Sequence, residues 1–399
     1  MIFSESFLEP RLRRDPEFDR RDVYVITQNA LADEHYLEYI RAHYQRSAQQ
    51  DPLFFSELLR PRVERMDNLH TNFLARLALP LDHALTQLGS SIECQRRAVG
   101  VYPSQELRLP TGADMQRYLS LYVQDWQERA KRGQLSPGET VEFNGQQARL
   151  NGSATVMAIN AMLTRQIFDQ NPERDFFVEE SFPIDWMYPH LTPFGTILKL
   201  ERQPPLELGP EIVERDRKFW RDYMSRLIGD WVKPETNVAE ICTFAQKVHL
   251  RRDLDGYQGD RKFLRDEQAQ KAFSKLRSAI AGVYDWRFRR AAGQLQQLQQ
   301  QLARPNLAPD AAQRLRADQQ RLTTEQWRMF QEAEFASKQA YALCPFSPEA
   351  FQRLVNLLLS AGRVGEALAV AETSQRLDPG NAFYTNVAGQ LRRMPSQGS

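Results

Sequence analysis

Apolar side chains recur at helical spacing along most of this chain. Within residues 113–131, Met115, Tyr122 and Trp126 lie on one stripe because they are seven and four positions apart. The same spacing predicts further helices over residues 33–44, 61–98, 154–169, 211–228, 236–250, 266–290 and 291–303. Asp33 suits the N-cap of the first of these, since its carboxylate accepts from free backbone N–H groups. The chain is therefore predicted to be largely helical, and wholly helical after Pro210.

Short β-branched and aromatic runs interrupt the helices in the first half of the chain. Strands are predicted over residues 22–27, 140–143, 147–150, 175–179 and 196–200. Asn144 and Gly145 predict a hairpin turn because both tolerate positive φ. A strand, a polar corner and a helix in succession open an α/β unit. We therefore predict an α/β domain over residues 1–208, partial and Rossmann-like, with the strand at 22–27 in a parallel sheet.

Beyond residue 322 the helical pattern repeats. Pro345 and Pro379 are 34 residues apart, which is the period of tetratricopeptide repeats, each a pair of helices. Small side chains are needed where the two helices of a pair approach closely. They are Ala333, Ser337 and Ala340 in the first repeat and Ala367, Ala371 and Ser374 in the second. We predict a helical stem over residues 209–322 and tetratricopeptide repeats with a C-terminal cap over residues 323–399. A plain helical bundle is the alternative.

The first helix of the second repeat begins at Pro348 and carries the face on which such arrays bind peptides. The residues predicted on this face are Glu349, Gln352, Asn356 and Leu359. So short an array has a second interpretation, in which it only braces the rest of the chain. A partner-binding role and a bracing role both stay open.

Charge and hydropathy exclude several classes of partner. The chain has 52 basic and 51 acidic side chains, a net charge of +1, which gives no electrostatic reason to bind nucleic acid or an anionic membrane. No stretch approaches the roughly 18 apolar residues of a membrane span. The first residues lack the basic start and apolar core of a secretory signal. If the chain is complete as given, we expect it in the cytoplasm.

Common catalytic and cofactor motifs are missing from the sequence. The six histidines have no metal-ligand spacing, and the three cysteines, Cys94, Cys242 and Cys344, form no Cys-x-x-Cys pair. We interpret the cysteines as small core residues. There is no glycine-rich phosphate loop and no Gly-x-Ser-x-Gly elbow. The sequence predicts no metal site, no cofactor and no catalytic residue.

Two polar segments are the candidates for ligand binding. Gln28 and Asn29 follow the predicted strand at 22–27, and open α/β sheets bind ligands at the carboxyl ends of their strands. The second segment follows the strand at 175–179 and combines carboxylates with aromatic rings, which suits sugar or peptide binding. Its residues are Glu179, Glu180, Asp185, Trp186 and Tyr188. A structural role is the alternative at both places.

Several longer runs resemble a bacterial protein family. They are Asp22-Val-Tyr-Val-Ile-Thr-Gln-Asn-Ala-Leu-Ala-Asp33, Glu179-Glu-Ser-Phe-Pro-Ile-Asp-Trp-Met-Tyr-Pro189, Leu191-Thr-Pro193, Lys271-Ala-Phe-Ser-Lys-Leu-Arg277 and Cys344-Pro-Phe-Ser-Pro348. Together they resemble the soluble C-terminal region of large membrane proteins related to protein O-mannosyltransferases, glycosyltransferase family 117. The likeness extends over roughly residues 22–379.

This resemblance implies a parent protein with a multi-spanning glycosyltransferase domain ahead of the present region. It implies a lipid-linked sugar as donor, an extracytoplasmic protein as acceptor, and a location outside the cytoplasm. The catalytic acid of the family belongs to the membrane domain, so no catalytic residue is carried over. The family pattern also has a strand and a Gly-Asp turn ahead of Met1, and we expect the α/β unit to lack that strand.

Three functions follow as hypotheses. The first is a non-catalytic accessory region of a protein O-mannosyltransferase-like enzyme that binds an acceptor or another partner protein. The second is a free-standing tetratricopeptide adaptor. The third is a sugar-processing enzyme that uses the loop at 179–188.

Overall fold

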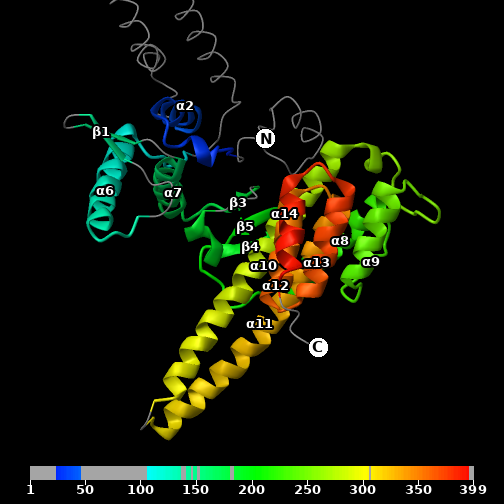
Figure 1. The fold of residues 1–399 in the computed structure, drawn as a ribbon. Helices are drawn as coiled ribbons and strands as arrows, with labels where there is room; N and C mark the ends of the chain where they lie inside the picture. The colour runs from blue at the N-terminus through cyan, green and yellow to red at the C-terminus, as the bar shows by residue number, and fades with distance from the viewer. Residues whose placement is uncertain are drawn as a thin grey trace, which may run out of the picture. The chain divides into compact units, whose positions relative to one another are not determined.

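The computed structural model describes residues 24–45, 106–135, 141–144, 147–150, 153–179, 184–304 and 307–394, and most of them are helical (Figure 1). The chain divides into two compact units, residues 1–174 and 175–399. The division falls inside the region predicted as one α/β domain, residues 1–208. The predicted helix at 61–98 and Cys94 lie outside the described residues.

The first unit is built from helices and one hairpin. Its elements are η2 (Gln28–Ala30), α2 (Glu34–Tyr44), α6 (Gly112–Lys131), β1 (Val141–Asn144), β2 (Gln147–Leu150) and α7 (Ser153–Gln170). Asp33 caps α2 as predicted, because its carboxylate accepts from the backbone N–H groups of His35 and Tyr36. The predicted hairpin is confirmed, since β1 and β2 pair antiparallel.

The strand predicted over residues 22–27 is wrong for the residues that the structure describes. Residues 24–27 are extended but pair with no strand. Tyrosine side chains take their backbone groups instead: the Tyr44 hydroxyl bonds both the N–H and the carbonyl of Val25, and the Tyr36 hydroxyl accepts from the N–H of Thr27. A strand-like sequence therefore ends as an extended segment held against α2.

The second unit begins with a small sheet. Its strands are β3 (Phe176–Val178), β4 (Leu191–Phe194) and β5 (Ile197–Leu200), in the order β3–β5–β4 with both pairs antiparallel. The strands predicted at 175–179 and 196–200 are confirmed. Strand β4 is an addition, which Pro193 obscures in the sequence because proline usually argues against a strand. No parallel pair occurs among the described strands, so the expected parallel sheet is not found there.

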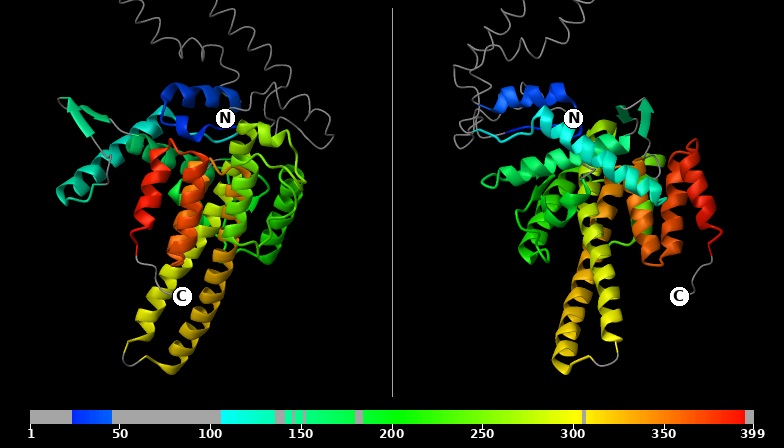
Figure 2. Two further views of the ribbon diagram at one scale, coloured as in Figure 1. Left: turned by 45° about the vertical axis from the view of Figure 1, so that its right-hand side comes forward. Right: turned by 90° about the vertical axis from the view of Figure 1, so that its left-hand side faces the viewer.

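Helices make up the rest of the second unit. They are α8 (Pro210–Leu227), α9 (Val238–Ala245), the π-helical turn η4 (Gln246–Leu250), η5 (Phe263–Arg265), α10 (Glu267–Leu302), α11 (Pro309–Leu343), α12 (Pro348–Ser360), α13 (Val364–Leu377) and α14 (Ala382–Leu391). The two helices predicted over 266–290 and 291–303 are one continuous helix, α10. Both views of Figure 2 show α10 and α11 as a long hairpin whose far end extends past the other helices of this unit.

The far end of this hairpin is held by a narrow apolar seam. Ala291 and Leu295 of α10 pack on Leu322 of α11, with Leu298 partly buried against them. In the core of this unit, Trp220 of α8 is completely buried. In the described part of the chain no helix is both long enough and apolar enough to cross a membrane.

The small side chains at the 34-residue period are all buried. Ala333, Ser337 and Ala340 on α11 and Ala367, Ala371 and Ser374 on α13 have at most 1% of their surface exposed. The Tyr341 hydroxyl bonds the Ser374 hydroxyl at 2.8 Å and so ties α11 to α13. Cys242 and Cys344 are free and buried, which confirms the interpretation of these two as core residues.

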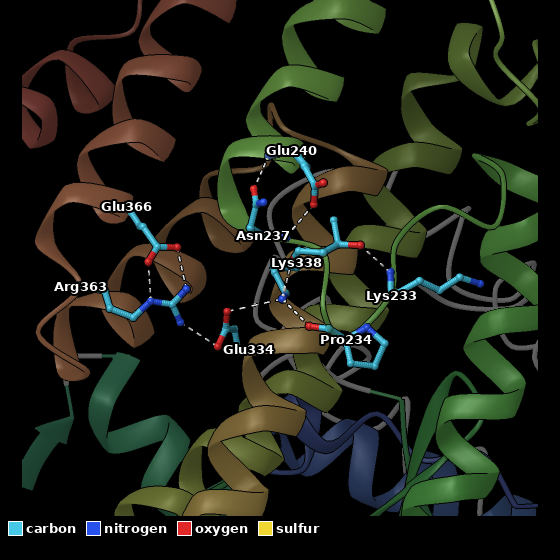
Figure 3. A network of polar contacts seen from close by, with 9 residues as sticks. Lys233, Pro234, Asn237, Glu240, Glu334, Lys338, Arg363 and Glu366 are labelled. Carbon is cyan, nitrogen blue, oxygen red and sulfur yellow. Dashed lines mark hydrogen bonds and ion pairs between the residues drawn. The ribbon is translucent and has the colours of Figure 1, made fainter.

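A buried lysine fixes the segment ahead of α9 to α11 (Figure 3). The Lys338 ammonium donates to the carbonyls of Pro234 at 2.9 Å and Thr236 at 2.7 Å, and it lies 3.5 Å from the Glu334 carboxylate. Glu334 also pairs with Arg363 at the start of α13. Lys338 and Glu334 of α11 therefore link the segment ahead of α9 and the start of α13 to the same helix.

Candidate peptide-binding face

Helix α12 presents amide side chains to solvent on the face predicted to bind a partner. Gln352 and Asn356 are exposed, and Glu349 and Leu359 are half-buried. The opposite side of α12 is apolar, with Phe351 and Leu354 buried. The capping Ser347, whose hydroxyl accepts from the N–H of Ala350, starts the helix and so sets which side faces solvent.

The second predicted site lies on the short helix η3 (Asp185–His190). Met187 and His190 are buried, and His190 Nδ1 donates to the carbonyl of Glu201 at 2.7 Å. This bond and the burial of Met187 fix how η3 lies on the sheet. Asp185 is then exposed, and the Trp186 ring meets the His190 ring edge to face, with centroids 6.2 Å apart.

Tyr188, the third predicted residue of η3, contacts α10. Its ring stacks on the Trp286 ring with centroids 5.8 Å apart and an interplanar angle of 26°. The guanidinium of Arg290 lies over the same Trp286 ring at 5.3 Å. Tyr188 and Arg290 therefore both pack on the Trp286 ring.

Arg353 of α12 reaches the same stripe of α10. Its guanidinium lies so close to Gly282 that a Cβ added there would stand 2.7 Å from Nη1. Gly282, Trp286 and Arg290 are four residues apart, so they follow one side of α10. We name the surface formed by Tyr188, Gly282, Trp286, Arg290, Arg353, Gln352 and Asn356 the α10–α12 face.

The electrostatics of Tyr188 reflect this convergence. Burial raises the pKa of its phenol, the positive charge of Arg353 opposes that rise, and the carboxylates of Asp185 and Asp285 add to it. The phenol therefore stays neutral and remains a hydrogen-bond donor at physiological pH. Tyr188 of the 179–188 loop and Arg353 of α12 therefore both lie against α10.

The remaining predicted residues lie elsewhere. Gln28 and Asn29 belong to η2 in the first unit, where the Asn160 side chain bonds the carbonyl of Asn29 and the N–H of Ala32. These two hydrogen bonds hold that corner against α7. Glu179 is exposed after β3, and Glu180 lies outside the described residues.

Sequence reasoning missed Trp286, Arg290 and Arg353. The signal for the first two was present as an aromatic and a cation four residues apart on a predicted helix, the spacing of a stacked pair. Nothing in the sequence ties Arg353 to Gly282, since that contact depends on how α12 crosses α10. Within the described ranges no cluster of His, Cys, Asp and Glu is arranged to hold a metal ion.

Comparison with known proteins returns no match to a family model, to a curated protein or to a solved structure. The α10–α12 face is therefore interpreted from its own residues.

Proposed function

We propose that this chain is a non-catalytic protein-binding scaffold whose α10–α12 face holds a segment of a partner protein. The observation that carries the proposal is the convergence of η3, α10 and α12. Stacked rings, two arginines and two exposed amides occur together on this face. Aromatic rings and arginines are the residues that most often anchor protein interfaces, and amides bond the backbone of an extended peptide.

We further propose that α10 with α11 and α12 with α13 are tetratricopeptide hairpins, and that α14 is their C-terminal cap. The 34-residue proline period and the burial of six small side chains at matching positions support this assignment. In such hairpins the first helix of each pair lines the binding surface. On this assignment α10 and α12 are the lining helices, and they carry the residues of the α10–α12 face.

The resemblance in sequence to the C-terminal region of protein O-mannosyltransferase-like membrane proteins suggests the biological setting. In that setting the bound partner is the acceptor protein of the membrane-embedded glycosyltransferase domain, or another subunit beside it. The chain then contributes binding, and the parent's membrane domain contributes the chemistry.

A pull-down tests the binding role. The immobilised full-length chain is incubated with the exported proteins of its host, and the recovered proteins are identified by mass spectrometry. We expect Gln352→Ala with Asn356→Ala to reduce recovery. Arg314→Ala with Arg316→Ala, at exposed positions on the α11 arm of the hairpin, is the matched control and should not. Equal recovery by all three proteins would favour the bracing role.

A bracing role is the second candidate, because Lys338 and the Tyr341–Ser374 bond tie α9, α11 and α13 into one block. The sugar-processing alternative has a separate test. We expect the purified chain to neither transfer nor hydrolyse glycosides. An activity that Glu180→Gln abolishes would contradict the non-catalytic proposal.

A further inference from the structure

Trp327 of α11 exposes its ring to solvent on the long hairpin. Its side chain is 62% exposed, more than any other aromatic side chain in the described ranges. The ring stacks on the Phe330 ring with centroids 6.0 Å apart and an interplanar angle of 21°, and the Phe288 ring of α10 lies 5.4 Å from Phe330. Phe330 is buried and Phe288 is half-buried. Rings from both helices therefore form one cluster, and Trp327 is its solvent-exposed member.

The side chains next to Trp327 on the same side of α11 are uncharged. Residues three and four positions away are neighbours on a helix surface, and here they are Thr323, Thr324, Phe330 and Gln331. Thr323, Thr324 and Gln331 are exposed. We name the surface formed by Phe288, Thr323, Thr324, Trp327, Phe330 and Gln331 the Trp327 face.

The charges beside the Trp327 face are paired within the chain. Glu334, seven residues after Trp327, pairs with Arg363, and Arg328 pairs with Glu325. A partner surface that carries charged groups would lose their hydration against this face and gain no ion pair. The face therefore favours an occupant that is itself uncharged and partly aromatic.

A second copy of this chain supplies such a surface. Across a two-fold axis the same residues meet from both sides, so any unpaired charge would face a charge of its own sign. Rings pack on rings, and hydroxyls and amides both donate and accept, so an uncharged face suits its own copy. The hairpin also extends past the other helices of the second unit (Figure 2), which leaves room for a second hairpin to cross it.

We propose that two copies of this chain associate through their Trp327 faces, with the hairpins crossing at Trp327 about a two-fold axis. The Trp327 ring of each copy packs on the ring cluster of the other. Trp286 and Phe288 are two residues apart, about 200° around α10, so the α10–α12 face lies on the opposite side and stays open in both copies. The inference goes beyond the proposed function and does not depend on it.

Analytical ultracentrifugation of the full-length chain tests the association. We expect a monomer–dimer equilibrium with a dissociation constant in the range of roughly 1–50 μM, because the face is small. Trp327→Gln should raise this constant roughly tenfold or more, since a large aromatic side chain at the centre of an interface dominates its affinity. Tyr39→Gln is the matched control, because it removes an exposed ring that stacks on Tyr36, and it should associate as wild type.

Charge substitutions test whether the two faces meet. Thr323→Glu with Gln331→Glu places a carboxylate on each side of Trp327, and Thr323→Lys with Gln331→Lys places an ammonium at each position. Each double variant should be monomeric alone, because like charges then meet across the axis whichever way the hairpins cross. An equimolar mixture of the two should form a heterodimer. Unchanged urea midpoints show that the variants fold.

Crosslinking of the purified chain locates the contact. The photoreactive residue p-benzoylphenylalanine at position 331 should give a crosslinked dimer. At position 313, fourteen residues before Trp327 and about 21 Å along α11, it should give none. A wild-type chain that stays monomeric at about 100 μM would overturn the inference. A dimer that Trp327→Gln leaves unchanged would also overturn it, and so would a monomeric mixture of the charge variants.

Discussion

The Arg353 guanidinium of α12 lies against Gly282 of α10. A Cβ at position 282 would stand 2.7 Å from Nη1 and 3.0 Å from Cζ of Arg353. Both atoms are at the end of a flexible side chain, and Gly282 lies within a helix. The close approach therefore positions the guanidinium on the binding face more than it holds the two helices together.

Gly282→Ala should separate binding from stability. Alanine favours a helix over glycine by up to about 1 kcal/mol, while the new methyl group displaces only the tip of Arg353. We expect the urea midpoint to stay or rise and the recovery of the partner protein in the pull-down to fall. A fall in both would show that the contact is structural.

Asp216 and Arg277 form a fully buried ion pair that should be costly to break. Arg277 Nη1 donates to Asp216 Oδ2 at 2.8 Å, and both side chains have 0% exposure. Tyr284 donates to the same oxygen. Asp216→Asn leaves a buried, uncompensated guanidinium, so we expect the free energy of unfolding to fall by about 3–5 kcal/mol. Urea unfolding measures it.

The same pair offers a control for that measurement. Replacing both partners with apolar residues, Asp216→Leu with Arg277→Met, leaves no unpaired charge and should cost less than the sum of the single changes. If Asp216→Asn lowered the free energy of unfolding by less than about 1 kcal/mol, the result would contradict the view that this pair is desolvated.

Lys338→Met should loosen α9 from the helices beside it. The ammonium donates to two carbonyls ahead of α9, and burial lowers its pKa. Its removal leaves the buried Thr236 carbonyl unpaired and also removes the bond to the Pro234 carbonyl. We expect a loss of about 3 kcal/mol and faster hydrogen exchange across α9. Lys233→Met, which removes an exposed pair with Asp230, is the control and should change little.

His249 should make the second unit less stable in mild acid. Burial lowers its pKa from 6.5 to about 4, and its ring packs against Phe244 and Phe346. The unfolded chain binds the proton more readily than the folded chain, so stability falls as the pH drops below 6.5. Between pH 7.5 and 5.5 the loss should be about 1 kcal/mol.

Urea midpoints at the two pH values measure this loss. His249→Leu should flatten the pH dependence, whereas His35→Gln, at an exposed position on α2, should leave it intact. An equal slope in wild type and His249→Leu would assign the acid sensitivity to other groups.

The helices were predictable because their signals are local. Residues 113–131 and 154–169 carry apolar stripes, and the structure places α6 and α7 over them within one or two residues. The hairpin turn after Asn144 is equally local. The continuity of α10 was not predicted, because a Gln-rich segment resembles a separate helix until its seam is seen to pack on α11.

The sheet and the binding face depend on contacts between distant segments. The sequence of residues 22–27 suits a strand. In the structure, the hydroxyls of Tyr44 and Tyr36 bond the backbone of Val25 and Thr27, in place of a neighbouring strand. Tyr188 was predicted as a site residue, yet its partner Trp286 depends on how η3 lies against α10. The periodicity of apolar residues shows which side of a helix or strand is apolar. It does not determine which other helix or strand packs against that side.

Photo-crosslinking at Asn356 tests the central claim most directly. The full-length chain carrying p-benzoylphenylalanine at position 356 is expressed in its host, irradiated, and examined for crosslinked proteins. The matched control carries the same group at Gln313, an exposed position on the α11 arm. If the α10–α12 face binds a partner protein, position 356 should give a discrete crosslinked protein and position 313 should give none. Absence of a crosslink from position 356, or the same products from both positions, would contradict it.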